Sequence, residues 1–328
     1  MGNRQALCAE LDPRAQREIS LSLVVPVYNE AGVVDQFVDR VNQLFSSKCE
    51  IDLEIVFVND GSTDRTLDHL RALQRSNRSI KVIELSRNFG KESALSAGLA
   101  ESSGQLVVPM DADLQDPPEL IFKMIELWQS GCDVVVAKRI NRDADSWAKR
   151  MTASFFYRIH NWVADTCIPP NVGDFRLMDR MVVDALNALP ESRRFMKGLF
   201  AWLGFRTGVV EYVRPMRIAG EGKLNGWFLW NFAIEGITGF STAPLKLWTY
   251  LGSIVALTSL LFAILIMFRT LIYGIDVPGY ASIIVAVTLL GGLQLMGIGV
   301  IGEYLGRTYV ESKRRPVYVV RRVYKSED

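Results

Sequence analysis

Two aspartates, Asp111 and Asp113, follow an apolar run and open the segment DADLQDPPE at 111–119. Alternate side chains of an extended chain point the same way, so carboxylates at this spacing repel each other unless a cation joins them. A hard divalent ion with oxygen ligands, Mg²⁺ or Mn²⁺, fits such a pair and keeps positions open for phosphate oxygens. Alone the pair is weak evidence, because acid pairs are common on protein surfaces.

Two further polar turns end apolar runs earlier in the chain. PVYNE spans 26–30, and NDGSTD spans 59–64, where Gly61 permits a sharp turn and Ser62 or Thr63 can cap a helix. By itself the second turn is more typical of a helix cap than of a ligand site. Neither turn is a dinucleotide or P-loop motif, which disfavours hydride transfer and P-loop nucleotide hydrolysis.

Alternating strand and helix patterns must position these turns. Short β-branched runs predict strands at 21–27, 54–58, 82–85, 106–110 and 134–137, and helical patterns lie between them near 31–46, 64–75, 90–100 and 118–130. This alternation predicts an α/β fold with a largely parallel sheet covered by helices. Ligands of such sheets bind at the carboxyl ends of the strands, where the acidic turns fall.

Composition removes several classes of function. The 328 residues hold 37 Lys+Arg and 36 Asp+Glu, so the net charge of +1 argues against a nucleic-acid partner. Two histidines and four scattered cysteines leave little material for a zinc site or a histidine-based triad. The chemistry therefore depends on carboxylates, basic side chains and a bound metal.

The C-terminal third predicts a membrane anchor. Residues 247–268 and 279–302 carry no charge, and as helices they would extend roughly 33–36 Å, enough for a bilayer core of about 30 Å. Basic residues gather after the second run, which predicts a multi-pass protein of the inner (plasma) membrane with both termini cytoplasmic. The N-terminus is polar through Ser20 and does not predict a signal peptide.

The predicted organisation has five parts. They are a polar segment (1–20), a catalytic domain (21–225), an interfacial helix (226–243), a two-helix anchor (244–303) and a basic tail (304–328). Trp227 and Trp230 suit the headgroup level, although an ordinary domain-packing helix fits the segment that contains them equally well.

Seven segments together resemble the inverting family 2 glycosyltransferases of the GT-A fold. They are VVPVYNE (24–30), NDGSTD (59–64), RNFGKESAL (87–95), DADLQDPPE (111–119), AKR (137–139), GDFRLMDR (173–180) and RIAGEGKL (217–224). With the paired apolar runs, the chain is most similar to polyisoprenyl-phosphate glycosyltransferases of the bacterial bactoprenol type, and more distantly to dolichol-phosphate mannose synthases. One departure is Gly222, where such enzymes usually have Ser before the lysine.

The resemblance implies roles by position on the donor side. Asp111 would lie near the ribose or the sugar, Asp113 with Gln115 would hold the metal, and Asp174 would take the place of a catalytic base. The remaining donor-binding residues would line the nucleoside pocket: Pro26, Tyr28, Glu30 and Asp60. A phosphate acceptor is already largely ionised at neutral pH, so a positioning role for Asp174 remains an alternative.

The acceptor side can be argued from charge. A lipid phosphate approaching so many acids needs cations to receive it. The candidates are Arg139, Arg176, Arg217 and Lys223, each of which taken singly could be ordinary surface charge.

The expected reaction is hexose transfer from a nucleotide sugar, UDP-glucose foremost, to undecaprenyl phosphate. A GDP-mannose-dependent dolichol-phosphate mannose synthase is the nearest alternative, and a catalytically silent nucleotide-binding scaffold is the alternative from another class. The oligomeric state stays open, with a homo-oligomer as one outcome.

Overall fold

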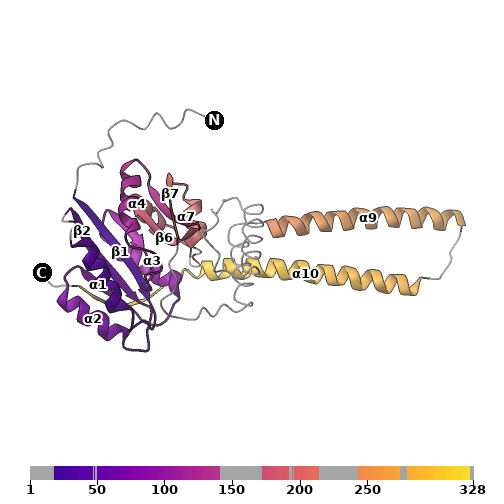
Figure 1. Cartoon of the computed structure of the whole chain (residues 1–328). Coiled ribbons are helices and arrows are strands. Elements are labelled where there is room, and N and C mark those ends of the chain that lie inside the picture. Colours follow the sequence, from indigo (N-terminus) through magenta and orange to yellow (C-terminus); the bar gives the residue numbers. More distant parts are fainter. Residues whose placement is uncertain are drawn as a thin grey trace, which may run out of the picture.

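The computed structural model describes residues 18–46, 48, 50–140, 172–191, 194, 196–213, 243–273 and 279–325. Within these ranges an eight-stranded sheet has the order β7-β5-β6-β4-β1-β2-β3-β8 (Figure 1). The strands are β1 (Ile19–Val27), β2 (Ile51–Asn59), β3 (Ile80–Leu85), β4 (Leu106–Pro109), β5 (Val134–Arg139), β6 (Val172–Asp179), β7 (Thr207–Tyr212) and β8 (Val320–Tyr324). The five strands predicted from the sequence are confirmed.

The helices between the first five strands also lie where the patterns predicted them. The described helices are α1 (Val34–Phe45), α2 (Thr66–Ser76), α3 (Lys91–Glu101), α4 (Leu120–Gln129), α6 (Arg180–Asn187), α7 (Met196–Trp202), α9 (Ala243–Tyr273) and α10 (Tyr280–Ser312). Strand pairs β1–β2, β2–β3, β1–β4 and β5–β7 are parallel, whereas β6 and β8 run antiparallel to their neighbours. The α/β fold with a mostly parallel sheet is therefore confirmed, in a mixed form.

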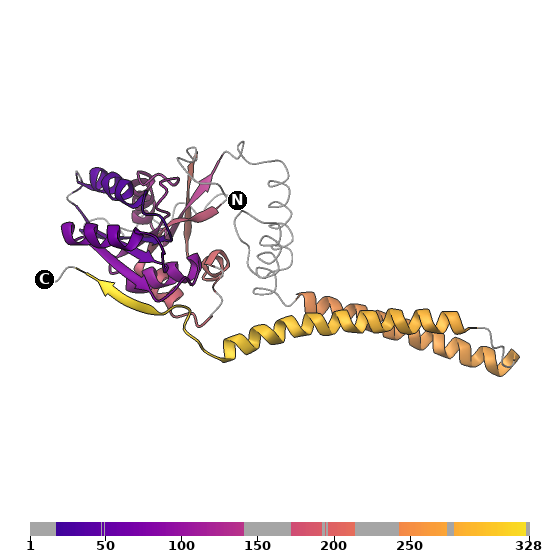
Figure 2. The same cartoon turned by 90° about the horizontal axis from the view of Figure 1, so that it is seen from below.

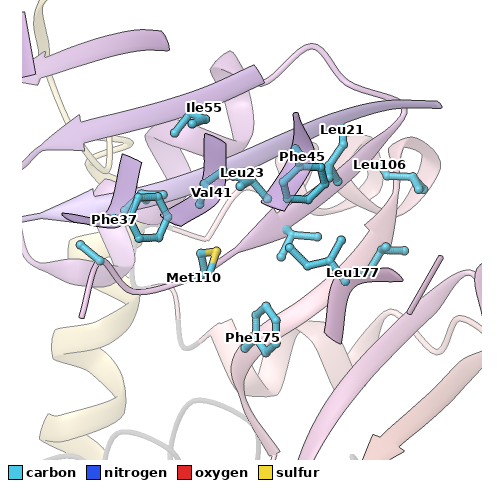
Figure 3. Packing of buried hydrophobic residues seen from close by; sticks show 14 of the residues in the cluster. Leu21, Leu23, Phe37, Val41, Phe45, Ile55, Leu106, Met110, Phe175 and Leu177 are labelled. Atoms are coloured by element: carbon cyan, nitrogen blue, oxygen red, sulfur yellow. The ribbon is translucent and has the colours of Figure 1, made fainter. Parts of the chain in front are cut away.

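The sheet is buried on both faces. Along β1, Leu21 and Leu23 pack into one cluster while Val24 packs into the other, the alternation expected of a strand. Phe37 and Phe45 of α1 cover the first face (Figure 3), and α3 covers the second. This helix lies so close to the sheet that a Cβ at Gly98 would be 2.3 Å from Val24 Cγ1. The carboxyl ends of the strands are thus held by two packed layers.

The strand β8 was not anticipated, since its residues read only as part of a basic tail. It pairs antiparallel with β3, placing Tyr324 opposite Val82, with a register shift next to Leu85. The amide of Ser86 donates to the carbonyl of Val319 at 2.9 Å, which extends the pairing beyond the strand. The chain thus returns from α10 to the edge of the sheet (Figure 2).

The helices α9 and α10 lie side by side in both views and extend away from the sheet (Figures 1 and 2). They contain the two apolar runs at 247–268 and 279–302. Taken over the described residues alone, none of the helices meets the length and hydropathy required to cross a bilayer. The predicted interfacial helix lies outside the described residues except for Ala243, the first residue of α9.

Candidate active site

The turns after β1 and β2 are joined by side-chain hydrogen bonds. The amide of Asn29 donates to Ser62 Oγ at 3.0 Å, and Asn29 Oδ1 accepts from the amide of Thr63 at 2.8 Å. The amide of Glu30 donates to Thr66 Oγ1 at 2.9 Å. The expected helix cap by Ser62 or Thr63 is wrong, because the N-cap of α2 is Arg65 and makes no side-chain cap hydrogen bond. Ser62 and Thr63 instead fix the turn that carries Tyr28 and Glu30.

Asp60 holds a third segment against these turns. Its two carboxylate oxygens accept hydrogen bonds from the amides of Phe89 at 2.7 Å and Gly90 at 2.9 Å. Gly61 has a φ of +66°, and a Cβ there would lie 2.5 Å from Asn88 N, so no larger residue fits. The RNFGKESAL segment is thereby brought to the carboxyl ends of β1 and β2, where α3 begins.

A pocket of about 330 Å³ opens at this point. It brings together six residues predicted from the sequence, and the roles assigned to them remain predictions: Pro26, Tyr28, Glu30, Asp60, Asp111 and Asp113. The other lining residues are Val27, Asn88, Gly90, Lys91 and Ala94. We call this cavity the acidic pocket, since four of its lining side chains are carboxylic acids. It lies at the strand ends, as the fold class predicted.

Lys91 is the site residue that the sequence analysis missed. Its ammonium lies 2.6 Å from Asp111 Oδ1 and 3.3 Å from Asp174 Oδ2. Burial lowers the pKa of Lys91, but the charges of Asp111 and Asp174 outweigh that effect and raise the pKa above its usual value, so the side chain stays protonated. The signal was present, because Lys91 lies inside one of the seven segments that carried the resemblance.

Glu30 faces the same group of acids without an equivalent cation of its own. Burial, then the charges of Asp111 and Asp113, raise the pKa of Glu30 to about 7, while Lys91 acts in the opposite direction. Its Oε2 is buried and has no hydrogen-bond partner in the part of the chain that the structure describes. Such an oxygen beside two carboxylates is unfavourable until a cation or a donor group enters the acidic pocket.

The turn that carries Asp113 is well defined. The amide of Gln115 donates to Asp113 Oδ1 at 3.1 Å, and Leu114 between them has a φ of +54°. Gln115 is buried and is not among the residues that line the acidic pocket, so its assignment as a metal ligand remains a prediction.

Among the described residues, no three His, Cys, Asp or Glu side chains form a ready-made metal cluster. The donor set nevertheless fits Mg²⁺ or Mn²⁺. These ions take one or two carboxylates and fill their other positions with phosphate oxygens and water. Asp113, with the orphaned Glu30 Oε2 nearby, provides hard oxygen ligands of that kind.

Arg176 is buried within the protein. It is 4% exposed, its guanidinium stacks on Phe200 at 3.8 Å, and its Nη2 donates to the carbonyl of Gly173 at 2.9 Å. Burial lowers the pKa of Arg176 to about 10, and the charge of Asp174 only partly opposes the shift. The predicted contact between Arg176 and the acceptor phosphate does not follow from this placement, because the side chain supports the backbone of residues 173–174 instead.

Arg139 lies at the end of β5, where the sequence analysis expected a cation. Its Nη2 would be 3.4 Å from a Cβ at Gly173, so its guanidinium lies against the backbone that leads to Asp174. The other two predicted acceptor cations, Arg217 and Lys223, lie outside the described residues.

Comparisons with known proteins identify the family of the chain. Residues 22–186 match the family described as glycosyl transferase family 2. The chain is 52% identical over 302 residues to an uncharacterized glycosyltransferase of Synechocystis sp., with 92% of this chain and 95% of that one covered. It is 48% identical to the prophage bactoprenol glucosyl transferase homolog of Escherichia coli K12, with 94% and 100% covered. It is 50% identical to the bactoprenol glucosyl transferase of Shigella phage SfV, with 92% and 98% covered.

Similarity to solved structures is more distant. The glucosyl-3-phosphoglycerate synthase of Mycobacterium tuberculosis, solved with Mn²⁺, UDP-glucose and phosphoglyceric acid, is 20% identical with a TM-score of 0.47. The alignment covers 67% of this chain and 78% of that one.

Proposed function

The chain belongs to glycosyl transferase family 2, and from that premise we propose that it transfers glucose from UDP-glucose to undecaprenyl phosphate. The product is a β-linked polyisoprenyl-phosphate sugar, formed with inversion at the anomeric carbon. The observation that carries the proposal is the acidic pocket at the strand ends, beside which Lys91 joins Asp111 to Asp174. The names of relatives about 50% identical over nearly the whole chain support glucose and bactoprenol as the substrates.

On the donor side, the nucleoside diphosphate occupies the acidic pocket. Tyr28 is 46% exposed at its rim and offers an aromatic face to the base. Asp111 lies further in, near the sugar. Asp113 would hold a divalent ion, which when bound would supply Lewis-acid chemistry by neutralising charge on the departing diphosphate.

On the acceptor side, a phosphate oxygen attacks the anomeric carbon opposite the nucleotide. Two unit charges 4 Å apart interact by about 4 kcal/mol at an effective dielectric constant near 20, so carboxylates strongly repel an unaccompanied phosphate. Lys91, which pairs with Asp174, and Arg139, which lies against Gly173, offset that repulsion. Arg176 contributes indirectly by bracing the backbone at Gly173.

Asp174 then serves as a positioning group. The second pKa of a phosphomonoester is about 6, so the attacking oxygen needs no base at neutral pH. Asp174 holds Lys91 at 3.3 Å instead. An Asp174→Asn variant is expected to lose activity by the same factor from pH 6 to pH 8.5 and to keep a residual rate. Complete inactivity across that range with acceptor binding intact would establish an essential base.

A membrane anchor completes the proposal. The uncharged runs at 247–268 and 279–302 fall within α9 and α10, and these helices expose apolar side chains along their length, among them Leu257, Phe262, Leu265, Leu295 and Ile298. Two spans return the chain to the side from which it came. The pairing of β8 with β3 supports this topology, because the tail and the catalytic domain share one sheet. We place both on the cytoplasmic face of the plasma membrane.

The test uses the full-length protein in membranes or detergent. It is incubated with undecaprenyl phosphate, Mn²⁺ and either UDP-glucose or GDP-mannose, and the lipid fraction is analysed by mass spectrometry. A hexosyl lipid formed from UDP-glucose is the expected result. Product from GDP-mannose alone would identify a mannose synthase, and no lipid product with any nucleotide sugar would favour a binding scaffold.

A further inference from the structure

Three side chains at the β7 edge form a connected chain of polar contacts. Tyr212, the last residue of β7, donates its hydroxyl hydrogen bond to Asp116 Oδ1. The same hydroxyl accepts from Arg139 Nε at 3.1 Å, and Arg139 Nη2 lies 3.7 Å from Asp116 Oδ1. Donor-side and acceptor-side segments, distant in the sequence, therefore meet at one hydroxyl.

Two of the three side chains in this series of contacts are held in place by burial. Asp116 is 5% exposed and Tyr212 is 6% exposed, so neither is free to turn toward solvent. Burial and the bond to Asp116 raise the pKa of Tyr212 to about 12, which keeps the hydroxyl protonated and donating. The Arg139 side chain is 28% exposed, so part of it can be reached by a ligand.

Asp116 and Arg139, the outer members of this series of contacts, lie next to different parts of the site. Asp116 directly follows Gln115 on the turn that carries Asp113, so its position is tied to that of the donor-side residues. Arg139 lies against Gly173, the neighbour of Asp174, and is near enough for the charge of Asp111 to raise its pKa, although burial lowers it. With Nε committed to Tyr212, the direction of the remaining guanidinium N–H groups is set.

We propose that Tyr212 is a positioning residue for the acceptor: its hydroxyl, oriented by Asp116, aims the Arg139 guanidinium beside Asp174 so that it receives the acceptor phosphate. This inference rests on the proposed function, because it assumes a phosphate acceptor. A guanidinium binds phosphate through paired, directional N–H groups, so its orientation matters more than that of an ammonium. The same turn thus holds the donor and orients the acceptor cation.

The test compares two tyrosine variants that remove equivalent hydroxyls. Tyr212→Phe deletes the proposed positioning bond, and Tyr324→Phe deletes a bond from Tyr324 to Glu84 Oε2, 2.9 Å long, on β8 at the opposite edge of the sheet. Tyr212→Phe is expected to raise the KM for undecaprenyl phosphate about tenfold. The Kd for UDP with Mn²⁺ stays close to wild type, and the Tm falls by no more than it does in Tyr324→Phe, which also removes a hydroxyl bonded to a buried acid. Tyr324→Phe leaves the acceptor KM unchanged.

A double-mutant cycle separates positioning from packing. In an Arg139→Ala background, Tyr212→Phe is expected to cause no further rise in acceptor KM, since the hydroxyl acts through the arginine. An additive effect in that background, or an equal loss of UDP affinity, overturns the inference.

Direct binding separates this inference from the proposed function. A short-chain polyisoprenyl phosphate is titrated into wild type and Tyr212→Phe in detergent, with UDP and Mn²⁺ present. Weaker binding by the variant supports the inference even if no sugar is transferred, in which case only the proposed reaction fails. Equal binding by both proteins overturns the inference while transfer by wild type still stands. No binding by wild type overturns both.

Discussion

The two edges of the sheet carry the same three kinds of side chain in different settings. Each has a buried acid that accepts a hydrogen bond from a tyrosine hydroxyl on the edge strand, with an arginine beside it. At the β7 edge these are Asp116, Tyr212 and Arg139, and at the β8 edge they are Glu84, Tyr324 and Arg321. Identical chemistry therefore does not by itself identify a functional site.

The difference lies in what the arginine faces. Arg139 is 28% exposed by its side chain and lies against the backbone next to Asp174, where we propose that the acceptor reacts. Arg321 is 71% exposed by its side chain, and its Nη1 donates to Glu84 at 3.0 Å. We propose that the first arrangement orients the Arg139 guanidinium for the acceptor phosphate, whereas the second holds β8 against β3. We expect changes at the first edge to alter turnover and changes at the second to alter stability.

The largest expected effect is at Asp113. Replacing it with Asn removes a charged ligand of the proposed divalent ion, and turnover should fall by roughly a thousandfold or more, the scale of Lewis-acid catalysis. Glu84→Gln, the corresponding change to a buried acid near the β8 edge, should leave kcat within about twofold because no substrate group is near. Wild-type rates that survive EDTA, or near-normal activity in Asp113→Asn, would contradict the assignment.

Lys91 should show the next largest effect. Lys91→Met keeps the length of the side chain but leaves Asp111 and Asp174 without their shared ammonium, so the reacting groups shift and kcat should fall about a hundredfold. Lys81 provides the control, because it pairs with Glu101 at 3.1 Å on β3, next to β8. If Lys81→Met lowered kcat as much as Lys91→Met, the contrast between the two edges would be lost.

The thermal stability of variants at Glu30 and Glu84 further tests the contrast between the acidic pocket and the β8 edge. The pKa of Glu30 is raised from 4.5 to about 7, so between those values the folded protein keeps a proton that the unfolded chain has lost. Stability without metal or nucleotide therefore falls as pH rises through this range. Glu30→Gln removes the penalty, and its Tm should exceed that of wild type more at pH 8 than at pH 5. A constant difference in Tm would refute the assigned cause.

Glu84→Gln should lower the Tm at pH 8, whereas Glu30→Gln should raise it. This carboxylate accepts hydrogen bonds from Arg321 and Tyr324, so replacing it weakens two contacts that hold β8 and lowers the Tm. An unchanged or raised Tm would show that the edge strand does not depend on this acid.

The smallest effect is expected from the exposed arginine. Arg321→Ala removes an ion pair that water largely screens and should reduce the free energy of unfolding by about 0.5 kcal/mol or less. Tyr324→Phe should cost about 1 kcal/mol, because its bond reaches a buried oxygen. Denaturant unfolding of both variants, with acceptor KM as the control, measures whether the β8 edge is purely structural.

Local pattern in the sequence was enough for the first half of the fold and for the acidic pocket. A β-branched run predicts each of the first five strands. Because parallel strands bring their carboxyl ends to one edge of the sheet, Glu30, Asp60, Asp111 and Asp113 are expected to converge there. These features follow from residues close together in the chain. The segment of Asp174, by contrast, was indicated only by the resemblance of GDFRLMDR to the family, and no strand was predicted over β6.

Only the tertiary structure decided which charged side chains face a substrate. Arg176 reads as an exposed cation but is buried against Phe200, while Lys91 reads as a helix residue but joins two site acids. Arg321 and Glu84 are 237 positions apart in the sequence, and the residues of β8 alone do not indicate that this strand pairs with β3. Local periodicity determines whether a segment is helix or strand, whereas the direction and partner of a charged side chain depend on contacts that form only when distant segments pack.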